Sequence, residues 1–451
     1  MGCGIKIIVA QSDDSMNTHQ QSEAKSIAAV IMPQQNITSA RPVKGDRQTI
    51  TSSWGESAAV KLGQGTHVVV VLTPPCLGSI EDQIIESLSM LDAILEKQSV
   101  AQEVISQTVF LKNPADRPTC DRLFTAHYGS ELPVTAYVYQ SPCNGAAVAI
   151  EAWCAGGKLV RVTRPHPQVS VVNHDDLSWI YCGLTPSPTA NGVYTSVING
   201  FAEIGKLLAK PAISFDRVIR LWIYLGNING VANQLERYTE LNRARTVFYR
   251  DFEFGRGIKV EGQKNIVYPA STGIGMAGSD LALSSLALST VRNDVFLLPI
   301  ENPNQTPAYH YPPVYSLESP KFVRALAVVI GKDVVTWLSG TASILNSESR
   351  HIGDIRKQTE QALDNIERLI APANYKAHGL GGAGASLPEI AQMRVYLKRP
   401  QDYEVCRDIC RQRLGQVPVL YVAADVCRSN LLVEMEGVLF TKLNRELTNR
   451  Q

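Results

Sequence analysis

The sequence predicts an α+β fold in which three copies of one ββαβαββ module form an intramolecular pseudo-trimer. The main observation is an internal repeat, because residues 107–116, QTVFLKNPAD, return at 393–402 as MRVYLKRPQD. A less regular third copy lies between them, where WIYL at 222–225 takes the place of the repeated strand. The length of 451 residues agrees with this count, since roughly 150 residues per domain gives three. Such a repeat indicates one structural unit copied within the chain.

The first half of each module is predicted to be a strand pair followed by an amphipathic helix. In the third copy, two β-rich runs at 322–330 and 334–344 flank Gly331-Lys332-Asp333, a sequence typical of a hairpin turn. A helix follows, because apolar residues recur at helical spacing in all three copies. They are Ile84, Leu88, Leu91 and Leu95 in the first copy, Val197, Phe201, Ile204 and Leu208 in the second, and Ile355, Thr359, Ala362, Ile366 and Leu369 in the third.

The second half of the module is predicted to be a strand, a helix and two closing strands. In two copies the strand ends at Lys-x-Pro, where proline ends the ladder and suits the first turn of a helix. In the third copy this places the helix at 401–414 and the closing strands at 418–424 and 430–440. Because the helices cover only one face of each mixed sheet, we expect the other three faces to pack together around a pseudo-threefold axis. Clefts then form between neighbouring modules.

These boundaries divide the chain into three predicted domains. Residues 1–157 form an N-terminal module with a polar segment at its start, residues 158–316 a degenerate central module with a linker, and residues 317–451 the C-terminal module. The linker, 299–316, is rich in proline and tyrosine, which is not typical of a floppy spacer. Its tyrosines either pack the seam between domains or line a pocket. They are Tyr309, Tyr311 and Tyr315.

Composition excludes several classes of function. The net charge of +1 offers no broad attraction for nucleic acid or anionic lipid. No run of about 18 apolar residues and no signal peptide are found, so we expect a cytoplasmic protein. Nine cysteines without paired Cys or His spacing indicate reduced thiols and no metal site. Three modules in one chain would satisfy a trimer internally, so we expect a monomer.

One position differs between the copies in a way that points to chemistry. Sixteen residues after an aligned proline stand Ala149, Ser285 and Glu434, so only the last copy has an acid there. A repeated scaffold needs the same residue everywhere, whereas a reaction needs its acid once. Glu436 recurs as Glu151 and is therefore interpreted as structural. Strand alternation puts Glu434 and Glu436 on one face, where we expect each to raise the pKa of the other.

Several segments resemble a known family. The module as a whole is similar to Rid proteins, which have a chorismate-mutase-like fold and form trimers with ligand clefts between subunits. More specifically, five segments over about 260–440 resemble the chorismatases, which build a Rid-like pseudo-trimer within one chain. The segments are 268–275 (YPASTGIG), 319–325 (SPKFVRA), 339–344 (SGTASI), 394–400 (RVYLKRP) and 424–437 (ADVCRSNLLVEMEG). Residues 1–157 resemble only a Rid module, which leaves room for a role of their own.

The resemblance implies cleavage of chorismate into pyruvate and a ring product. Glu434 matches the acid of the family, which protonates the enolpyruvyl methylene carbon and must therefore be held neutral near pH 7. Arg324 and Arg394 match positions that bind the two carboxylates of the substrate, for which guanidinium groups are suited. The resemblance further implies that Tyr315 donates its hydroxyl to the substrate. No cofactor is implied. We expect the catalytic cleft to be built by the third module and its contact with the second.

Two small residues suggest the product. Gly340 and Cys427 resemble the branch that forms 3-hydroxybenzoate, whereas the hydrolytic branch has alanine at both places and leaves a dihydroxycyclohexadienoate. A thiol near the ring would assist ring opening or proton movement, and glycine leaves room for the ring. Two other interpretations remain open: a Rid-type 2-iminoacid deaminase that binds its substrate through an arginine such as Arg428, and a non-catalytic ligand-binding protein.

Overall fold

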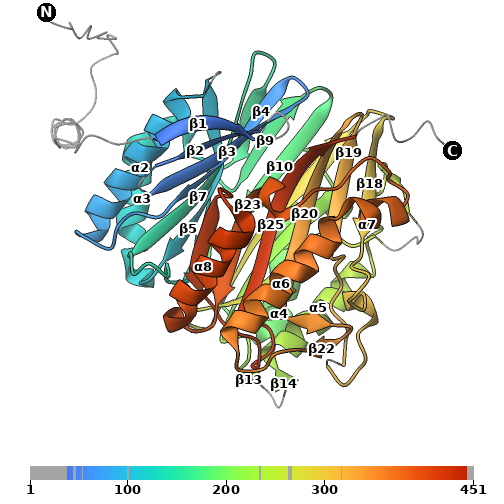
Figure 1. Cartoon of the computed structure of the whole chain (residues 1–451). Coiled ribbons are helices and arrows are strands. Elements are labelled where there is room, and N and C mark those ends of the chain that lie inside the picture. The colour runs from blue at the N-terminus through green and yellow to red at the C-terminus, as the bar shows by residue number, and fades with distance from the viewer. Residues whose placement is uncertain are drawn as a thin grey trace, which may run out of the picture. The chain divides into compact units, whose positions relative to one another are not determined.

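The computed structural model describes residues 38–43, 47–52, 54–98, 101–232, 235–262, 267–315 and 317–443. All of them belong to one compact unit, Ile37–Gln451. Most of the polar segment predicted at the start of the chain lies outside the described residues. Figure 1 shows the three sheets of this unit with their helices.

The predicted ββαβαββ order is confirmed in each of three sheets. The first module consists of β3 (Gly55–Leu62), β4 (Gly65–Leu72), α2 (Ile80–Glu96), β5 (Gln102–Leu111), α3 (Arg117–Tyr128), β6 (Val134–Val138) and β7 (Val148–Gly156). The second consists of β9 (Val169–His174), β10 (Leu177–Gly183), α4 (Val193–Leu208), β12 (Val218–Gly226), α5 (Arg237–Tyr249), β16 (Ala270–Met276) and β17 (Asp280–Thr290). The third consists of β19 (Ala325–Ile330), β20 (Asp333–Ala342), α6 (Ile355–Ile370), β23 (Ile390–Leu397), α8 (Tyr403–Leu414), β24 (Val419–Ala423) and β25 (Val433–Lys442).

The sheets are mixed, as predicted, and have the same pairing in each module. The two strands that flank the second helix are parallel: β5 with β6, β12 with β16, and β23 with β24. The last strand of each module lies between them and the opening hairpin and is antiparallel to its neighbours. The helices lie on one face, as α6 and α8 do on the third sheet in Figure 1. The predicted stripe of α6 is buried from Thr359 to Leu369.

Short elements extend each sheet beyond the repeated module. They are β1 (Thr38–Val43) and β2 (Arg47–Thr51) in the first, β8 (Arg161–His166) and β11 (Ser187–Pro188) in the second, and β15 (Lys259–Val260) and β18 (Val295–Ile300) in the third. β18 pairs with β19, so the predicted linker 299–316 starts two residues too early. The division of the chain at 157 and 316 stays a prediction.

The strand register corrects one predicted equivalence. Tyr396 on β23 lies opposite Glu434, and Phe110 on β5 lies opposite Ala149. In the second module the corresponding Tyr224 lies opposite Ala282, three residues before Ser285. Counting from the proline failed because the turn before the last strand differs in length between the copies. The conclusion that only the third module has an acid at this position is unchanged.

The uncovered faces of the three sheets meet in a shared core. One hydrophobic cluster combines Val69 and Trp153 of the first module with Trp179 of the second and Trp337 of the third. The ring centroids of Trp153 and Trp337 are 5.3 Å apart. The expected pseudo-trimer is thus held together by large apolar side chains from all three modules.

A buried ion-pair cluster lies within this core and also joins the modules. Arg394 of β23 binds Glu151 of the first module through two hydrogen bonds of 2.6 and 2.7 Å. It also contacts Glu436 of its own module at 3.2 Å, and Arg220 of the second module binds the other oxygen of Glu436. The Tyr224 hydroxyl accepts a further hydrogen bond of 2.6 Å from Arg394. All four charged residues are at most 3% exposed.

We predict that Arg394→Met destabilises the fold by about 3–5 kcal/mol, because Glu151 and Glu436 would remain buried without their shared cation. Urea unfolding measures this loss. Arg413→Met is the control, since Arg413 pairs with three acids at the surface and its loss should cost about 1 kcal/mol or less. Equal destabilisation by the two substitutions would contradict the central role of the cluster.

Candidate active site

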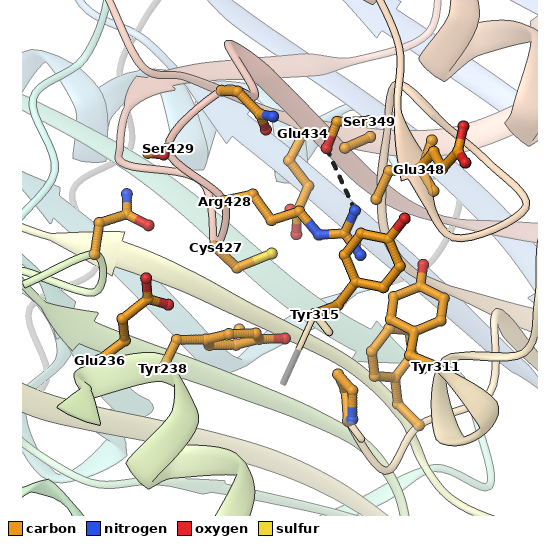
Figure 2. A pocket seen from close by; sticks show the side chains of 18 of the residues that line it. Glu236, Tyr238, Tyr311, Tyr315, Glu348, Ser349, Cys427, Arg428, Ser429 and Glu434 are labelled. Carbon is orange, nitrogen blue, oxygen red and sulfur yellow. Dashed lines mark hydrogen bonds between the residues drawn. The ribbon is translucent and has the colours of Figure 1, made fainter. Parts of the chain in front are cut away.

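A cavity of about 570 Å³ lies between the second and third modules, where the sequence predicted the cleft (Figure 2). The second module contributes side chains from α5 and β16, the tyrosine-rich linker contributes its end, and the third module contributes β20, β25 and the loop before β25. The lining residues from the second module are Asn229, Glu236, Tyr238, Ser271 and Gly273. Those from the linker and the third module include Tyr311, Val314, Tyr315, Phe322, Arg324, Gly340, Cys427, Arg428 and Glu434.

Glu434 is the acid of this cavity. It is the second residue of β25 and only 5% exposed. Its carboxyl group makes no hydrogen bond to any side chain or backbone group of the described residues, so its oxygens remain available to a ligand. Burial raises the pKa of Glu434 to about 8, and the nearby Glu436 carboxylate adds to the increase. An acid with this pKa is largely protonated at neutral pH and can act as a proton donor.

Glu436 behaves differently from the prediction. We expected the two acids to raise the pKa of each other, but the pKa of Glu436 is lowered. Burial alone would raise it, and the contacts with Arg220 and Arg394 outweigh that effect. Two acids on one strand face therefore have opposite states: Glu436 stays ionised in its ion pairs while Glu434 is held neutral. Such a separation is typical of acid–base sites.

Gly340 lies at a β-bulge beside the acid. The register of β20 with β25 shifts between Leu338 and Thr341, and the corresponding pairs β4–β7 and β10–β17 show no such shift. A bulge re-aims side chains and often occurs next to a site. A Cβ atom on Gly340 would lie 2.0 Å from Oε1 of Glu434. Glycine at this position therefore leaves the Glu434 carboxyl group, the flexible end of its side chain, in the place it occupies, whereas a larger residue would make it shift.

Cys427 faces the same space from the loop before β25, next to Tyr238 (Figure 2). Burial raises the pKa of the Cys427 thiol to about 12, and Glu434, which is ionised at such a high pH, adds to the increase. The neighbouring Tyr238 hydroxyl acts in the opposite direction and lowers the pKa of the thiol, but less than burial raises it. Cys427 is consequently a neutral thiol at physiological pH, which can exchange a proton but is a poor nucleophile.

Arginine side chains supply positive charge to the cavity. Arg324 is 2% exposed and donates hydrogen bonds to the Thr306 carbonyl, at 3.3 Å, and to the Tyr311 hydroxyl. Arg428 lies over the Tyr315 ring at 4.4 Å and donates to the Ser347 carbonyl at 2.8 Å. Neither guanidinium group has a carboxylate within 4.0 Å among the described residues, and one or more nitrogens of each lack a hydrogen-bond partner. They are arranged to receive an anion.

Arg245 is a third cation that the sequence analysis missed. It belongs to α5, is 1% exposed and donates to the Asn242 amide oxygen at 2.6 Å. Its guanidinium group lies near the ring of Phe322, a residue of the cavity wall. The signal in the sequence was a charged residue on the buried face of a helix, which is rare unless the charge is used.

Five of the six predicted site residues line the cavity together, and Arg394 does not. The guanidinium group of Arg394 is already occupied by Glu151, Glu436 and Tyr224 in the central cluster. The prediction of substrate contact is therefore not supported by its placement. Tyr315 is 37% exposed at the cavity edge, where its ring packs on Arg428.

The linker tyrosines divide between the two predicted roles. Tyr311 and Tyr315 line the cavity. Tyr309 packs against Tyr268 in the shared core, with ring centroids 5.7 Å apart.

Three further properties concern metals, thiols and membranes. Within the described ranges no group of three or more His, Cys, Asp or Glu residues is placed to hold a metal ion. The eight cysteines that the structure describes are free thiols. In that same part of the chain no helix has the length and apolar character needed to span a bilayer.

The fold and the site together define a class: a Rid-like pseudo-trimer within one chain, with a ligand cleft between two of its modules. No protein-family model matches the sequence. A 3-hydroxybenzoate synthase of Streptomyces hygroscopicus is 35% identical over 275 residues, which cover 58% of this chain and 74% of that protein. A chorismatase of Streptomyces rapamycinicus is 31% identical over 253 residues, covering 55% of this chain and 68% of that protein. The chain therefore belongs to the chorismatase family.

A crystal structure of a chorismatase has the same fold. It superimposes with a TM-score of 0.59 at 23% identity and covers 76% of this chain and 94% of that one. A short similarity links the chain to plain Rid proteins, since a RutC family protein of Pyrococcus abyssi is 29% identical over 90 residues. That match covers 20% of this chain and 63% of that protein, about one module.

We predict that the raised pKa of Glu434 makes the fold lose stability as the pH rises from about 4.5 to 8. In this window the unfolded state releases the Glu434 proton and the folded state keeps it, which costs about 1.4 kcal/mol per pH unit. Glu434→Gln has no such proton to release. The difference in unfolding free energy, variant minus parent, should therefore rise by a few kcal/mol between pH 5 and pH 8. Urea unfolding of both proteins at each pH measures the difference. Parallel pH dependences would show that Glu434 is not buried as an acid.

Proposed function

We propose that this protein cleaves chorismate to 3-hydroxybenzoate and pyruvate, with Glu434 as the general acid. One observation carries the proposal: a carboxyl group with raised pKa and no hydrogen-bond partner shares a cavity with guanidinium groups that lack carboxylate partners. The names of the relatives reported above support the substrate. Cleavage of a dianionic enol ether requires a neutral acid to protonate it and unpaired cations to bind its carboxylates.

Arg324 and Arg428 would bind the two carboxylates of chorismate. Guanidinium groups bind carboxylates through two parallel hydrogen bonds, and burial strengthens such pairs. Arg428 takes the place that the sequence analysis gave to Arg394. Arg245, behind Phe322 and Ser271, adds positive potential to the same wall. The hydroxyl groups of Tyr311 and Tyr315 border these cations, so they also can donate to the substrate.

The reaction needs one proton in and one proton out. Glu434 gives its proton to the methylene carbon of the enolpyruvyl group, and the double-bond electrons form the new C–H bond. The resulting oxocarbenium ion leaves the ring as pyruvate when the ether C–O bond breaks. The ether oxygen leaves with pyruvate, so the hydroxyl group on the neighbouring ring carbon supplies the oxygen of the product. That oxygen bonds to the carbon that carried the ether, forming an epoxide, and its bond to the original carbon then breaks. With the net loss of one proton the ring becomes aromatic, so the atoms of chorismate are all found in 3-hydroxybenzoate plus pyruvate.

Cys427 and Gly340 support this product over the hydrolytic one. The neutral thiol of Cys427 can relay a proton during aromatisation. Formation of the hydrolytic product would instead consume a water molecule, and the branch of the family with that product has alanine in place of Gly340 and Cys427. We further propose that the chain acts as a cytoplasmic monomer, because its three modules complete the trimer internally. Light scattering that gives a mass near three chains would overturn the monomer.

The experiment that tests the proposal is chromatography of the products after incubation with chorismate, with pyruvate assayed in parallel. A peak of 3-hydroxybenzoate with equimolar pyruvate supports it. Pyruvate with a dihydroxycyclohexadienoate would assign the chain to the hydrolytic reaction, and 4-hydroxybenzoate would require a different ring step. Unchanged chorismate would leave 2-iminoacid deamination, tested by ammonia release, or ligand binding without turnover.

We predict that Glu434→Gln lowers kcat by at least 10²-fold, the usual contribution of a general acid, while chorismate still binds. In the parent, kcat/KM should fall tenfold per pH unit above about pH 8, because only protonated Glu434 is active. Residual activity above a tenth of the parent would contradict the role of Glu434. Denaturation curves of the variant confirm that folding is intact.

We also predict that Gly340→Ala lowers kcat, by up to roughly 10²-fold, because the added methyl group makes the Glu434 carboxyl group shift from its present position. Gly205→Ala is the matched control, since a Cβ atom there meets nothing within 4 Å. Initial rates of pyruvate release compare the two variants. Full activity of Gly340→Ala would mean that Glu434 acts from another position.

A further inference from the structure

A second cavity, of about 250 Å³, lies between the first and third modules, away from the site described above. The first module contributes the start of β3, the end of β4 and the loop before β7, and the third contributes α8 and β24. The lining residues include Ser52, Trp54, Glu56, Val71, Thr73, Asn144, Tyr403, Arg407, Cys410, Arg411, Val419 and Tyr421. Nothing in the proposed reaction uses this space.

The second cavity is the pseudo-threefold counterpart of the active site. Tyr421 on β24 lies opposite Val395, and Gly273 on β16 lies opposite Ile223, the equivalent strand position of the second module. Tyr421 and Gly273 are therefore equivalent, and each lines its own cavity. The helices α8 and α5 also place a tyrosine in each cavity: Tyr403 in the second and Tyr238 in the active site.

The opposing wall follows the same equivalence but has the opposite charge. The hairpins β3–β4 and β19–β20 turn after Leu62 and Ile330. Glu56 lies six residues before Leu62, and Arg324 lies six residues before Ile330. Glu56 thus stands where the active site has Arg324. Ala149 stands where it has Glu434, so the second cavity lacks the counterparts of both the buried Arg324 and the acid of the active site.

Polar groups in this cavity are only partly used. Glu56 accepts a hydrogen bond of 3.2 Å from the Val419 amide and has no cation within 4.0 Å in the described part of the chain. The indole N–H of Trp54 is buried without a hydrogen-bond partner. Burial raises the pKa of Glu56. A buried donor and an unpaired carboxylate in one cavity are costly unless a ligand binds them.

The remaining walls are aromatic. The rings of Tyr403 and Tyr421 meet edge to face at 5.3 Å, and Trp54 lines the same cavity. Such walls favour a flat ring. Arg411 lies at the edge and is exposed, where it can accommodate an acidic substituent of a ligand.

We propose that the cavity between the first and third modules is a second binding site, which takes a single-ring aromatic compound whose hydroxyl or amino group donates a hydrogen bond to Glu56. It excludes a dianion of the kind the active site binds, because Glu56 replaces the arginine. A hydroxybenzoate has the ring, the donor and one carboxylate for Arg411. The site would then bind the aromatic product of the proposed reaction. This role rests on the proposed function, whereas the existence of the binding site does not.

The test is isothermal titration of the full chain with 3-hydroxybenzoate. The double variant Arg324→Met/Arg428→Met removes the anion-binding groups of the active site, so any remaining binding belongs elsewhere. We expect one remaining site, weakened roughly 10-fold or more by the additional substitution Glu56→Gln. Benzoate, which lacks the donor, should bind this site equally weakly whether or not Glu56 is replaced by Gln. Trp54→Phe, which keeps the ring and removes the N–H group, should also weaken binding.

Two outcomes would overturn the proposal: no binding to the double variant, or binding that Glu56→Gln leaves unchanged. Denaturation midpoints show whether each variant is folded. With Glu56→Gln as the single change, turnover of chorismate should equal that of the parent. If the proposed reaction were wrong instead, the parent would not turn over chorismate, but binding that depends on Glu56 would still be measurable.

Discussion

The buried ion pairs of Arg394 and Arg220 with Glu151 and Glu436 are the interaction on which the rest of the structure depends. They connect all three modules at one point, whereas other polar contacts, such as those of Gln140 with Gly275 and of Asn229 with Val426, each join two modules. A buried charge tolerates little displacement, because a lost partner leaves an uncompensated ion. The cluster therefore fixes the register of the three sheets against one another as well as their contact.

The same cluster sets the state of the catalytic acid. Because Arg220 and Arg394 keep Glu436 ionised, a negative charge lies two residues from Glu434 on the same strand face. That charge adds to burial in holding Glu434 protonated. A structural ion pair thus has a chemical consequence, and the first module takes part in it through Glu151, although it contributes no residue to the active-site cavity.

The sequence predicted the module order, the location of the cleft and the acid, because repetition reveals both a common scaffold and its exceptions. It reached less far where three-dimensional partners decide. Arg394 has the charge that a carboxylate ligand requires, but its anions are Glu151 and Glu436, which the sequence places 243 and 42 residues away. The bulge at Gly340 and the role of Arg245 depend on packing against other modules. Ser285 was misaligned because spacing through a turn is less reliable than strand pairing.

Fusion of the modules explains why two equivalent cavities can differ so much. In a trimer of identical chains every cleft has the same residues, so a catalytic acid or a reversed charge would appear three times. In one chain each position is independent, and Glu434 stands where the other two modules have alanine, Ala149 and Ala282. The exchange of Arg324 for Glu56 has the same origin. A first module without catalytic residues is then not redundant, because it completes the central ion pairs and forms one wall of a cavity with chemistry of its own.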